Sequence, residues 1–271
     1  LGKKIAEKLN INTIDVNLKA FPDGEYCLRF ESSVADEEVV VVQTTGPPQD
    51  KNIMQLLLIL DAAKDLGARK VTAVVPYLAY ARQDKRFLAG EVVSAETIAK
   101  LIETCRIEKF ITVNIHSKKT LENFKVPNMN LSAITLLADY FKKRGLYGAF
   151  SLSPDKGAID LAEQADKILG GGCGWLKKER DRYTGEIQVE EKNLKVKGMD
   201  VIVFDDIIST GGTIARAIKM LKNQGARRVY AACVHPLLIG EAKNNILKSG
   251  AKEIVGTDSI ASSVKSLSLA P

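Results

Sequence analysis

Residues 201–213, VIVFDDIISTGGT, constrain the fold of this chain more than any other segment. The first four are apolar, with β-branched and aromatic side chains, which is typical of a short strand buried on both faces of a parallel sheet. Asp205 and Asp206 come where this strand is expected to end, and open α/β sheets bind ligands at the carboxyl ends of their strands. The residues after them predict an amphipathic helix that stops at Gly225. The segment therefore predicts the strand, ligand loop and helix of an α/β domain.

The loop between this strand and this helix has the chemistry of a sugar-phosphate site. Glycines let backbone N–H groups converge on an anion at the start of a helix, and neighbouring hydroxyls add further donors. Two adjacent carboxylates repel a phosphate, so they suit the vicinal hydroxyls of a sugar or a hydrated cation. The alternative is an ordinary turn with an aspartate helix cap. The candidate binding residues are Asp205, Asp206, Ser209, Thr210, Gly211, Gly212 and Thr213.

A similar pattern occurs earlier in the chain. Residues 38–77 and 199–236 both read as strand, loop, helix and strand, and both place Gly-Ala-Arg directly before the second strand. Chance similarity of two βαβ units is the alternative, but the shared tripeptide favours duplication. We therefore expect two similar α/β domains, residues 1–145 and 146–271, with the boundary near residues 144–147. The first copy's loop, QTTGPP, lacks the acids and the paired glycines, so we expect it to keep the scaffold without the sugar-phosphate site.

Two segments of the first half carry candidate nucleotide contacts. Residues 21–25, FPDGE, have strong turn chemistry, and as a ligand turn they would present Phe21 for stacking beside two acids. Residues 76–85, PYLAYARQDK, follow a predicted strand and are aromatic and then densely polar. Arg82 suits a phosphate, and Gln83 and Asp84 suit a base edge. A solvated charged loop is the alternative for this second segment.

Two further strand ends carry candidate metal contacts. His116 follows the predicted strand FITVNI, and Asp155 lies in the turn SPDKGA before a predicted helix. A lone histidine at a strand end is more often structural, and Pro-Asp is a common helix start. As ligand positions, His116 suits a metal or phosphate and Asp155 suits Mg²⁺. Residues 176–182, LKKERDR, are either a solvated loop or a loop that brings Lys and Arg to a reacting phosphate.

The composition excludes several classes of protein. The net charge of +6 is spread along 271 residues without a basic block interleaved with aromatics, so we expect no nucleic-acid partner. No apolar run approaches the roughly 20 residues of a membrane span, so we expect no membrane association. Four scattered cysteines without a CxxC pair predict reduced, mostly buried thiols in a cytoplasmic protein.

These motifs together resemble one family. Residues 201–213 resemble the phosphoribosyl signature of type I phosphoribosyltransferases. In order and spacing, FPDGE, PYLAYARQDK, SPDKGA, KKER and DDIISTGGT resemble the ribose-phosphate diphosphokinases, or phosphoribosyl pyrophosphate synthetases, of archaeal type. The similarity runs from residue 3 to about residue 258. It implies two type I phosphoribosyltransferase domains, each a mainly parallel sheet flanked by helices: a degenerate N-terminal copy with the ATP loops, and a C-terminal copy with the ribose 5-phosphate site.

The resemblance also assigns roles to residues of this chain. It implies that the turn at residues 21–25 reaches the ATP of a neighbouring subunit, and hence a homodimer or larger homo-oligomer. It implies catalysis by Lys178, Arg180 and His116, and Mg²⁺ at His116 and Asp155. The implied ATP contacts are Phe21, Asp23, Gly24, Glu25, Arg82, Gln83, Asp84 and His116. The implied ribose 5-phosphate contacts are Arg180, Asp205, Asp206, Ser209, Thr210, Gly211, Gly212 and Thr213.

The chain departs from the family pattern in a few places. Asn114 stands where the family often has Asp, and a neutral amide is a poorer Mg²⁺ ligand, which weakens the case for a second metal. Ser209 stands where many members have Asp. An α/β domain would place a strand before the helix at residues 3–10, and the ending SLSLAP is shorter than the family leads us to expect.

The expected activity follows from the resemblance. It is transfer of the diphosphoryl group of Mg-ATP to the C1 hydroxyl of ribose 5-phosphate, which gives 5-phosphoribosyl 1-diphosphate and AMP. Two alternatives share residues 201–213: a phosphoribosyltransferase that consumes phosphoribosyl diphosphate, and a non-catalytic regulatory homologue that binds phosphoribosyl ligands. FPDGE and ARQDK argue against the first alternative because it needs no ATP site, and Lys178 and Arg180 argue against the second.

Overall fold

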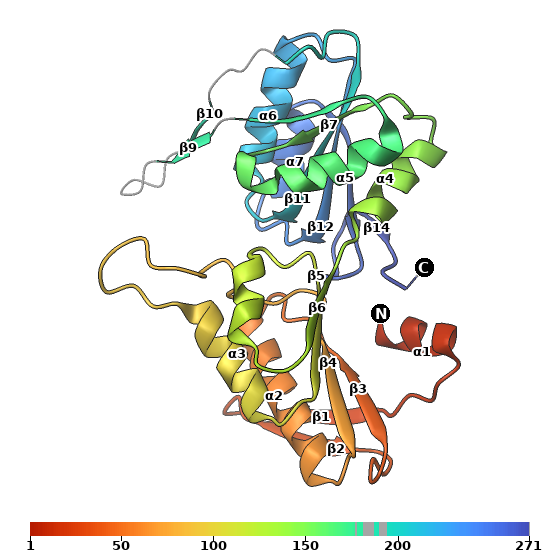
Figure 1. Ribbon diagram of the computed structural model, residues 1–271, viewed down its shortest axis with the longest axis vertical. Helices are drawn as coiled ribbons and strands as arrows, with labels where there is room; N and C mark the ends of the chain where they lie inside the picture. The colour runs from red at the N-terminus through yellow and green to blue at the C-terminus, as the bar shows by residue number, and fades with distance from the viewer. Residues whose placement is uncertain (177, 181–186, 190–193, 271) are drawn as a thin grey trace. The chain divides into compact units, whose positions relative to one another are not determined.

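The computed structural model of the chain describes residues 1–176, 178–180, 187–189 and 194–270 (Figure 1). These residues form two compact units, of which the first comprises residues 1–131 with the C-terminal end and the second comprises residues 132–269. Each unit has its own parallel sheet and its own hydrophobic core, so the predicted α/β class is confirmed. Among the described residues, no helix has both the length and the apolar character that a membrane crossing requires.

The first unit is built on a four-stranded parallel sheet of order β3-β4-β5-β6. The helices α2 and α3 pack together against it, with Leu56, Leu60 and Ile102 buried against Val71 and Phe110. Its elements are α1 (Gly2–Leu9), β3 (Glu38–Val42), α2 (Gln49–Asp65), β4 (Lys70–Val74), α3 (Ser94–Thr104), β5 (Lys109–Val113), the 3-10 helix η1 (Lys118–Asn123) and β6 (Asn128–Leu131).

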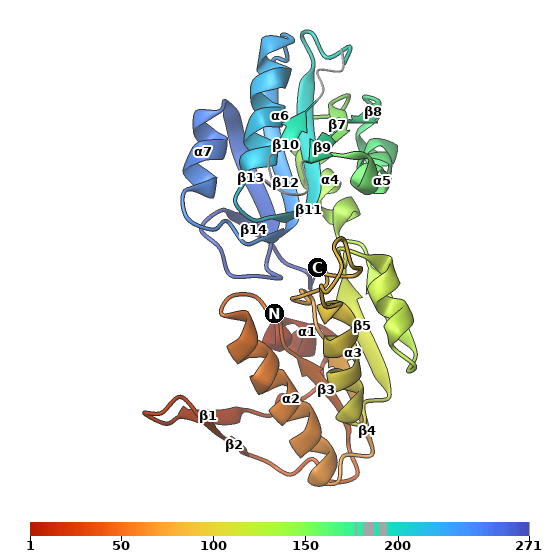
Figure 2. The ribbon, with the colours of Figure 1, turned by 90° about the vertical axis from the view of Figure 1, so that its left-hand side faces the viewer.

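An antiparallel hairpin projects from the first unit beyond α2 (Figure 2). It consists of β1 (Val16–Ala20) and β2 (Tyr26–Phe30), and its last pair is Ala20 with Tyr26. The turn between the strands is residues 21–25, where the Phe21 N–H donates to the Glu25 carbonyl and Gly24 takes φ +98°. The turn predicted from Pro-Asp-Gly is therefore confirmed.

The second unit is built on a six-stranded parallel sheet of order β14-β13-β12-β11-β7-β8. The helices α6 and α7 cover one face and α4 and α5 the other (Figure 2). Its helices are α4 (Ile134–Lys143), η2 (Lys156–Ala158), α5 (Ile159–Leu169), α6 (Gly212–Asn223) and α7 (Ala242–Lys248). Its strands are β7 (Phe150–Ser153), β8 (Cys173–Trp175), β11 (Asp200–Ile208), β12 (Arg228–Pro236), β13 (Ala251–Thr257) and β14 (Lys265–Leu267), with a small antiparallel pair β9 (Lys178–Arg180) and β10 (Ile187–Val189).

The division between the units falls at residues 131/132, before the predicted boundary at 145/146. The helix α4 lies between these two positions and packs on the second unit's sheet. The Phe141 ring lies edge-on to Phe204 of β11 and Tyr230 of β12, with centroids 6.4 and 5.5 Å apart. These contacts connect residues far apart in sequence, so local patterns did not reveal that α4 belongs with the second unit.

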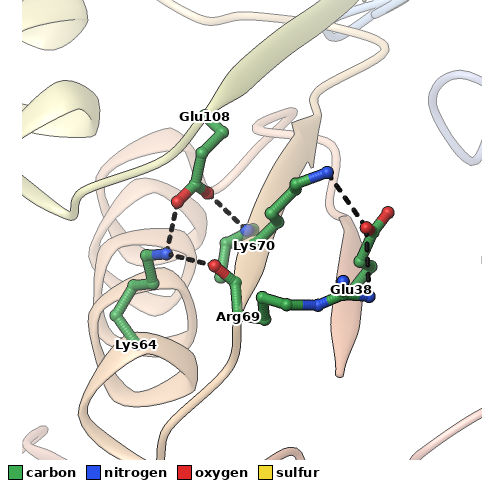
Figure 3. A network of polar contacts seen from close by, with 6 residues as sticks. Glu38, Lys64, Arg69, Lys70 and Glu108 are labelled. Atoms are coloured by element: carbon green, nitrogen blue, oxygen red, sulfur yellow. Dashed lines mark hydrogen bonds and ion pairs between the residues drawn. The ribbon is translucent and has the colours of Figure 1, made fainter. Parts of the chain in front are cut away.

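The two units repeat the same order of elements. In each, a strand, a long helix, a second strand, a shorter helix and two further strands follow one another, and the four strands are neighbours in that order. In each unit, the first strand of the repeat carries an acid beside two basic residues, one just before the second strand and one at its first position. Figure 3 shows these residues in the first unit. The matching sets are Glu38, Arg69 and Lys70, and Asp200, Arg227 and Arg228.

The cysteines follow the prediction only in part. All four are free thiols, as predicted, and Cys105 and Cys233 are buried. Cys27 and Cys173 are exposed, because Cys27 lies on the projecting hairpin and Cys173 on the edge strand β8.

Candidate active site

The two aspartates of residues 201–213 lie within β11 rather than after it. The strand was expected to end at Phe204, but its ladder with β12 continues through Asp205 opposite Cys233 and ends at Ile208 opposite Pro236. Pairing with a neighbouring strand outweighs the low β-propensity of aspartate here. The two carboxylates are therefore held by the sheet itself, and the loop proper is residues 209–211.

The loop leads into the N-terminus of α6 with its backbone donors unused. Among the described residues, no acceptor takes a hydrogen bond from the backbone N–H groups of residues 210–213, and no side chain caps α6. Gly211 has φ +73°, and a Cβ there would lie 2.9 Å from Ile246 Cδ1 of α7, so only glycine fits. Together with the hydroxyls of residues 209, 210 and 213, this geometry suits an anion such as a phosphate.

The charges of Asp155, which follows β7, and of Asp206 on β11 act on Asp205 of the same strand. Asp155 follows β7, which pairs with β11, and its Oδ1 accepts a 2.9 Å hydrogen bond from the Gly157 N–H. Burial raises the pKa of Asp205 well above its ordinary value, and the charges of Asp206 and Asp155 raise it further. A set of oxygen ligands with this much negative charge suits sugar hydroxyls or a hard divalent cation.

No preformed metal cage is present in the described part of the chain, where no three His, Cys, Asp or Glu side chains converge. Mg²⁺ usually takes one or two protein carboxylates and completes its shell with water and substrate phosphates. Asp155 belongs to the second unit and His116 to the first. Mg²⁺ binding at each of these two positions stays a prediction.

In the first unit, the loops after β4 and β5 meet. The Ser117 hydroxyl donates a 2.6 Å hydrogen bond to Asp84 Oδ2, which places Asp84 beside the loop that carries His116. Gln83 is held at its backbone, where its carbonyl accepts from the Ala95 N–H at the start of α3 at 3.2 Å. Arg82 and His116 are both exposed. The structure therefore brings together the predicted contacts of these two loops, with one oxygen of Asp84 already bound to its neighbour.

The predicted contacts on the hairpin lie apart from those loops. Phe21, Asp23, Gly24 and Glu25 are all exposed, and the Lys19 ammonium lies 5.2 Å from the centre of the Phe21 ring. The hairpin projects beyond α2, on the side away from α3 and β5 (Figure 2). Its function as a nucleotide contact stays a prediction.

The charged segment is described only in part. Lys178 and Arg180 lie on β9, opposite Val189 and Ile187 of β10. Residues 177, 181 and 182 of the same segment lie outside the described residues. The catalytic function assigned to Lys178 and Arg180 stays a prediction.

The comparisons with known proteins agree with one another. Residues 1–105 match the family model "N-terminal domain of ribose phosphate pyrophosphokinase", and residues 89–267 match the phosphoribosyl transferase domain. The chain is 42% identical to the ribose-phosphate pyrophosphokinase of Methanobrevibacter smithii, over all of this chain and 94% of that protein. The chain belongs to the ribose-phosphate pyrophosphokinase family. The predicted pair of phosphoribosyltransferase-type domains is thereby confirmed.

Two further relatives of this family cover nearly the whole chain. The ribose-phosphate pyrophosphokinase of Saccharolobus solfataricus is 41% identical over 96% of this chain and 89% of its own length. The crystal structure of phosphoribosylpyrophosphate synthetase from Mycobacterium smegmatis has a TM-score of 0.88 and is 30% identical, and the match covers 99% of this chain and 91% of that one. The similarity therefore extends through both units.

Sequence reasoning missed three residues that hold the first unit's loops. Thr45 lies in the loop QTTGPP, which we expected to be scaffold only, and it is fully buried with its hydroxyl bonded to the loop after β4. Tyr80 has φ +65° and donates its hydroxyl to Asp50, and Ser117 bonds to Asp84. No local pattern marks such contacts, because each joins segments that are distant in sequence.

Proposed function

We propose that this chain transfers the diphosphoryl group of Mg-ATP to the C1 hydroxyl of ribose 5-phosphate. The proposal rests on one observation: this chain, which matches its family along its whole length, contains two different kinds of candidate binding site. One is the N–H-lined loop after β11 together with the two carboxylates on that strand, and the other is the polar loop after β4. A phosphoribosyltransferase would need the first loop alone, and the comparisons do not favour it or a regulatory homologue.

The second unit would hold the acceptor. The backbone N–H groups of residues 210–213 and the nearby hydroxyls would bind the 5-phosphate, while Asp205 and Asp206 would accept hydrogen bonds from the ribose hydroxyls. The sheet holds both carboxylates in place, so the sugar would be oriented before reaction. Such positioning supplies much of the rate in phosphoryl transfer.

The first unit would hold the donor. Arg82 would contact the phosphates of ATP, Gln83 and Asp84 would lie along the nucleotide, and exposed His116 would contact the triphosphate or its metal. The ribose C1 oxygen would attack the β-phosphorus and the bond to the α–β bridging oxygen would break. AMP would leave, and the hydroxyl proton would pass to solvent.

Charge neutralisation would complete the site. Asp155 of the second unit and His116 of the first are each expected Mg²⁺ positions, and the bound metal would neutralise charge on the transferred group. Lys178 and Arg180 would add positive charge from β9. We propose further that Phe21, Asp23, Gly24 and Glu25 contact the nucleotide of a neighbouring subunit in a homo-oligomer, since the hairpin projects away from α3 and β5 of its own unit.

One assay tests the function directly. The purified chain is incubated with ATP, Mg²⁺ and ribose 5-phosphate, and AMP and phosphoribosyl diphosphate are measured. Equal amounts of both products, absent without ribose 5-phosphate, are expected. AMP formation no faster than in buffer would contradict the proposal. Activity with phosphoribosyl diphosphate and a nucleobase instead would indicate a transferase, and no turnover with either set would indicate a binding homologue.

The expected site of action is the cytoplasm. Four free cysteines, two of them exposed, support a reducing compartment.

A further inference from the structure

The loop after β3 in the first unit has the position of the phosphoribosyl loop without its chemistry. It comprises residues 43–48 and joins the first strand of the repeat to its long helix, as residues 209–211 do in the second unit. It carries no acid, and Asp50 in the first turn of α2 opposes an anion there. The loop is therefore unsuited to the ligand of its counterpart, and its contacts indicate another role.

Thr45 ties this loop to the loop after β4. The side chain is fully buried, and its hydroxyl donates to the Tyr77 carbonyl at 2.8 Å and accepts from the Ala79 N–H at 2.7 Å. The Thr45 N–H also donates to the Tyr77 carbonyl, at 3.0 Å. One residue thus satisfies backbone groups on both sides of Leu78, and it fixes the course of the loop just before Arg82.

Tyr80 makes a second tie to the same part of the first unit. Its φ of +65° is rare for a bulky residue, and such a conformation persists only where surrounding contacts enforce it. The Tyr80 hydroxyl donates to Asp50 Oδ1 on α2, and this bond raises the pKa of Tyr80. The Tyr80 carbonyl then accepts from the Gln83 N–H at 3.0 Å, so the turn that carries Arg82 starts from this residue.

The second unit has equivalent hydrogen bonds at the same place in the repeat, between the segments that follow its two matching strands. There the Leu238 N–H donates to the Ile208 carbonyl and the Ile239 N–H to the Ser209 carbonyl, both at 3.0 Å. In both units, then, the loop after the first strand is bonded to the loop after the second. In the second unit the loop after the first strand carries the candidate ligand groups, whereas in the first unit the loop after the second strand carries them.

We propose that Thr45, supported by the Tyr80–Asp50 bond, is a positioning residue for the nucleotide site. Residues 43–48 do not bind a ligand in this proposal. They hold residues 77–84 in the conformation that presents Arg82 to the phosphates of ATP. Thr45 itself touches no substrate. This inference rests on the proposed function for the identity of the ligand.

The first test compares Thr45→Val with Thr45→Ser. Valine keeps the shape of threonine but leaves the Ala79 N–H buried without an acceptor, whereas serine keeps both hydroxyl bonds. We expect Thr45→Val to raise the KM for ATP about 10-fold, with the KM for ribose 5-phosphate within about 2-fold of the parent. Thr45→Ser restores the parent KM for ATP. A general loss of folded protein lowers kcat and leaves both KM values unchanged, so this split separates positioning from stability.

A second variant keeps the test decisive if Thr45→Val does not fold. Tyr80→Phe removes one hydroxyl from a side chain that is 40% exposed, so the fold is not at risk. We expect a rise in the KM for ATP of about 3-fold, and no change in Tyr147→Phe, a control on an exposed tyrosine of the second unit. An unchanged KM for ATP in both Thr45→Val and Tyr80→Phe overturns the proposal, and so does an unchanged KM in Tyr80→Phe alone if Thr45→Val does not fold.

The binding of α,β-methylene ATP, measured by calorimetry without ribose 5-phosphate, separates this proposal from the proposed function. If the parent chain forms no AMP, the proposed activity fails, yet the analogue still reports whether Thr45→Val weakens nucleotide binding. If the parent is active and the variant binds the analogue as tightly as the parent, only the positioning role of Thr45 is wrong. If the parent neither forms AMP nor binds the analogue, both are wrong.

Discussion

Asp200 and Arg228 face each other across the first rung of β11 and β12, with Arg228 Nη2 2.6 Å from Asp200 Oδ2. Arg227 binds the same carboxylate, also at 2.6 Å, and the Asp200 side chain is only 6% exposed. Hydrogen bonds from Arg228 and then Arg227 hold the pKa of Asp200 well below its usual range despite burial, which opposes the shift. The first unit repeats the arrangement with Glu38, whose side chain is 51% exposed. The two units thus carry matching sets of ion pairs, one around a buried acid and one around an exposed acid.

This difference predicts unequal contributions to stability. Asp200→Asn removes a buried charge partner of two arginines, and we expect its Tm at pH 7 to fall by about 5 °C. Glu38→Gln, the matched change in the exposed set, should change the Tm little, because solvent screens such pairs. Circular dichroism melts of both variants check this. Equal losses in the two variants would show that burial does not decide the contribution.

The same shift sets a pH dependence. Since the pKa of Asp200 is lower in the folded chain than in the unfolded chain, its contribution is fully present above the unfolded pKa of about 4. It is lost as the pH falls from about 5 through that value toward the folded pKa. Between pH 6 and pH 3, the parent Tm should therefore fall more than that of Asp200→Asn. Parallel curves would contradict the assignment.

Much of the fold could be predicted from the sequence, because its signals are local. Apolar residues 201–204 mark a buried strand, Gly-Ala-Arg marks two equivalent helix ends, and Pro-Asp-Gly marks the hairpin turn. The predictions differ from the structure where contacts between residues distant in sequence determine where an element ends or packs. The ladder with β12 carries β11 past Asp205 to Ile208, and Phe141 draws α4 to the second unit. The contacts of Thr45 belong to the same class, since only the folded chain brings its loop to Tyr77.

The candidate site, like the fold, could be predicted only in part from the sequence. Its residue types and their order along the chain could be read from the sequence, and the strand ends bring Asp155 and Asp205 close enough to influence each other. Whether residues 21–25 serve their own chain or another depends on assembly, which one chain's pattern does not encode.

Two adjacent glycines of the phosphoribosyl loop should differ in their tolerance of a side chain. Gly211→Ala would force φ +73° on a non-glycine residue and press a Cβ against Ile246, so we expect a lower Tm and a higher KM for ribose 5-phosphate. A Cβ at Gly212 would approach only Arg216 Nη2, at 3.7 Å, and alanine favours helix, so the Tm of Gly212→Ala should be equal or higher. Melting curves of both variants decide this, and an equal loss in both would show that neither φ nor Ile246 matters.

The function assigned to Lys178 predicts a loss in turnover rather than in binding. Lys178→Ala should lower kcat for AMP formation by about 100-fold or more, since a cation placed at the developing charge acts mainly in the transition state. Affinity for α,β-methylene ATP should stay within a few-fold of the parent. Lys178→Arg keeps the charge and serves as the control. If Lys178→Ala turned over at nearly the parent rate, the catalytic assignment would fail.

A mixture of two inactive variants can show whether the hairpin completes the site of another subunit. Asp23→Ala damages the hairpin turn, and Lys178→Ala damages the second unit's charged strand. If the site is shared, a mixed oligomer contains sites built from an intact hairpin of one chain and an intact Lys178 of the other. Co-refolded or co-expressed variants should then recover a substantial part of the parent AMP formation, although each variant alone is nearly inactive. If each chain serves its own site, every site in the mixture carries one of the two defects. In that case, no activity returns at any mixing ratio.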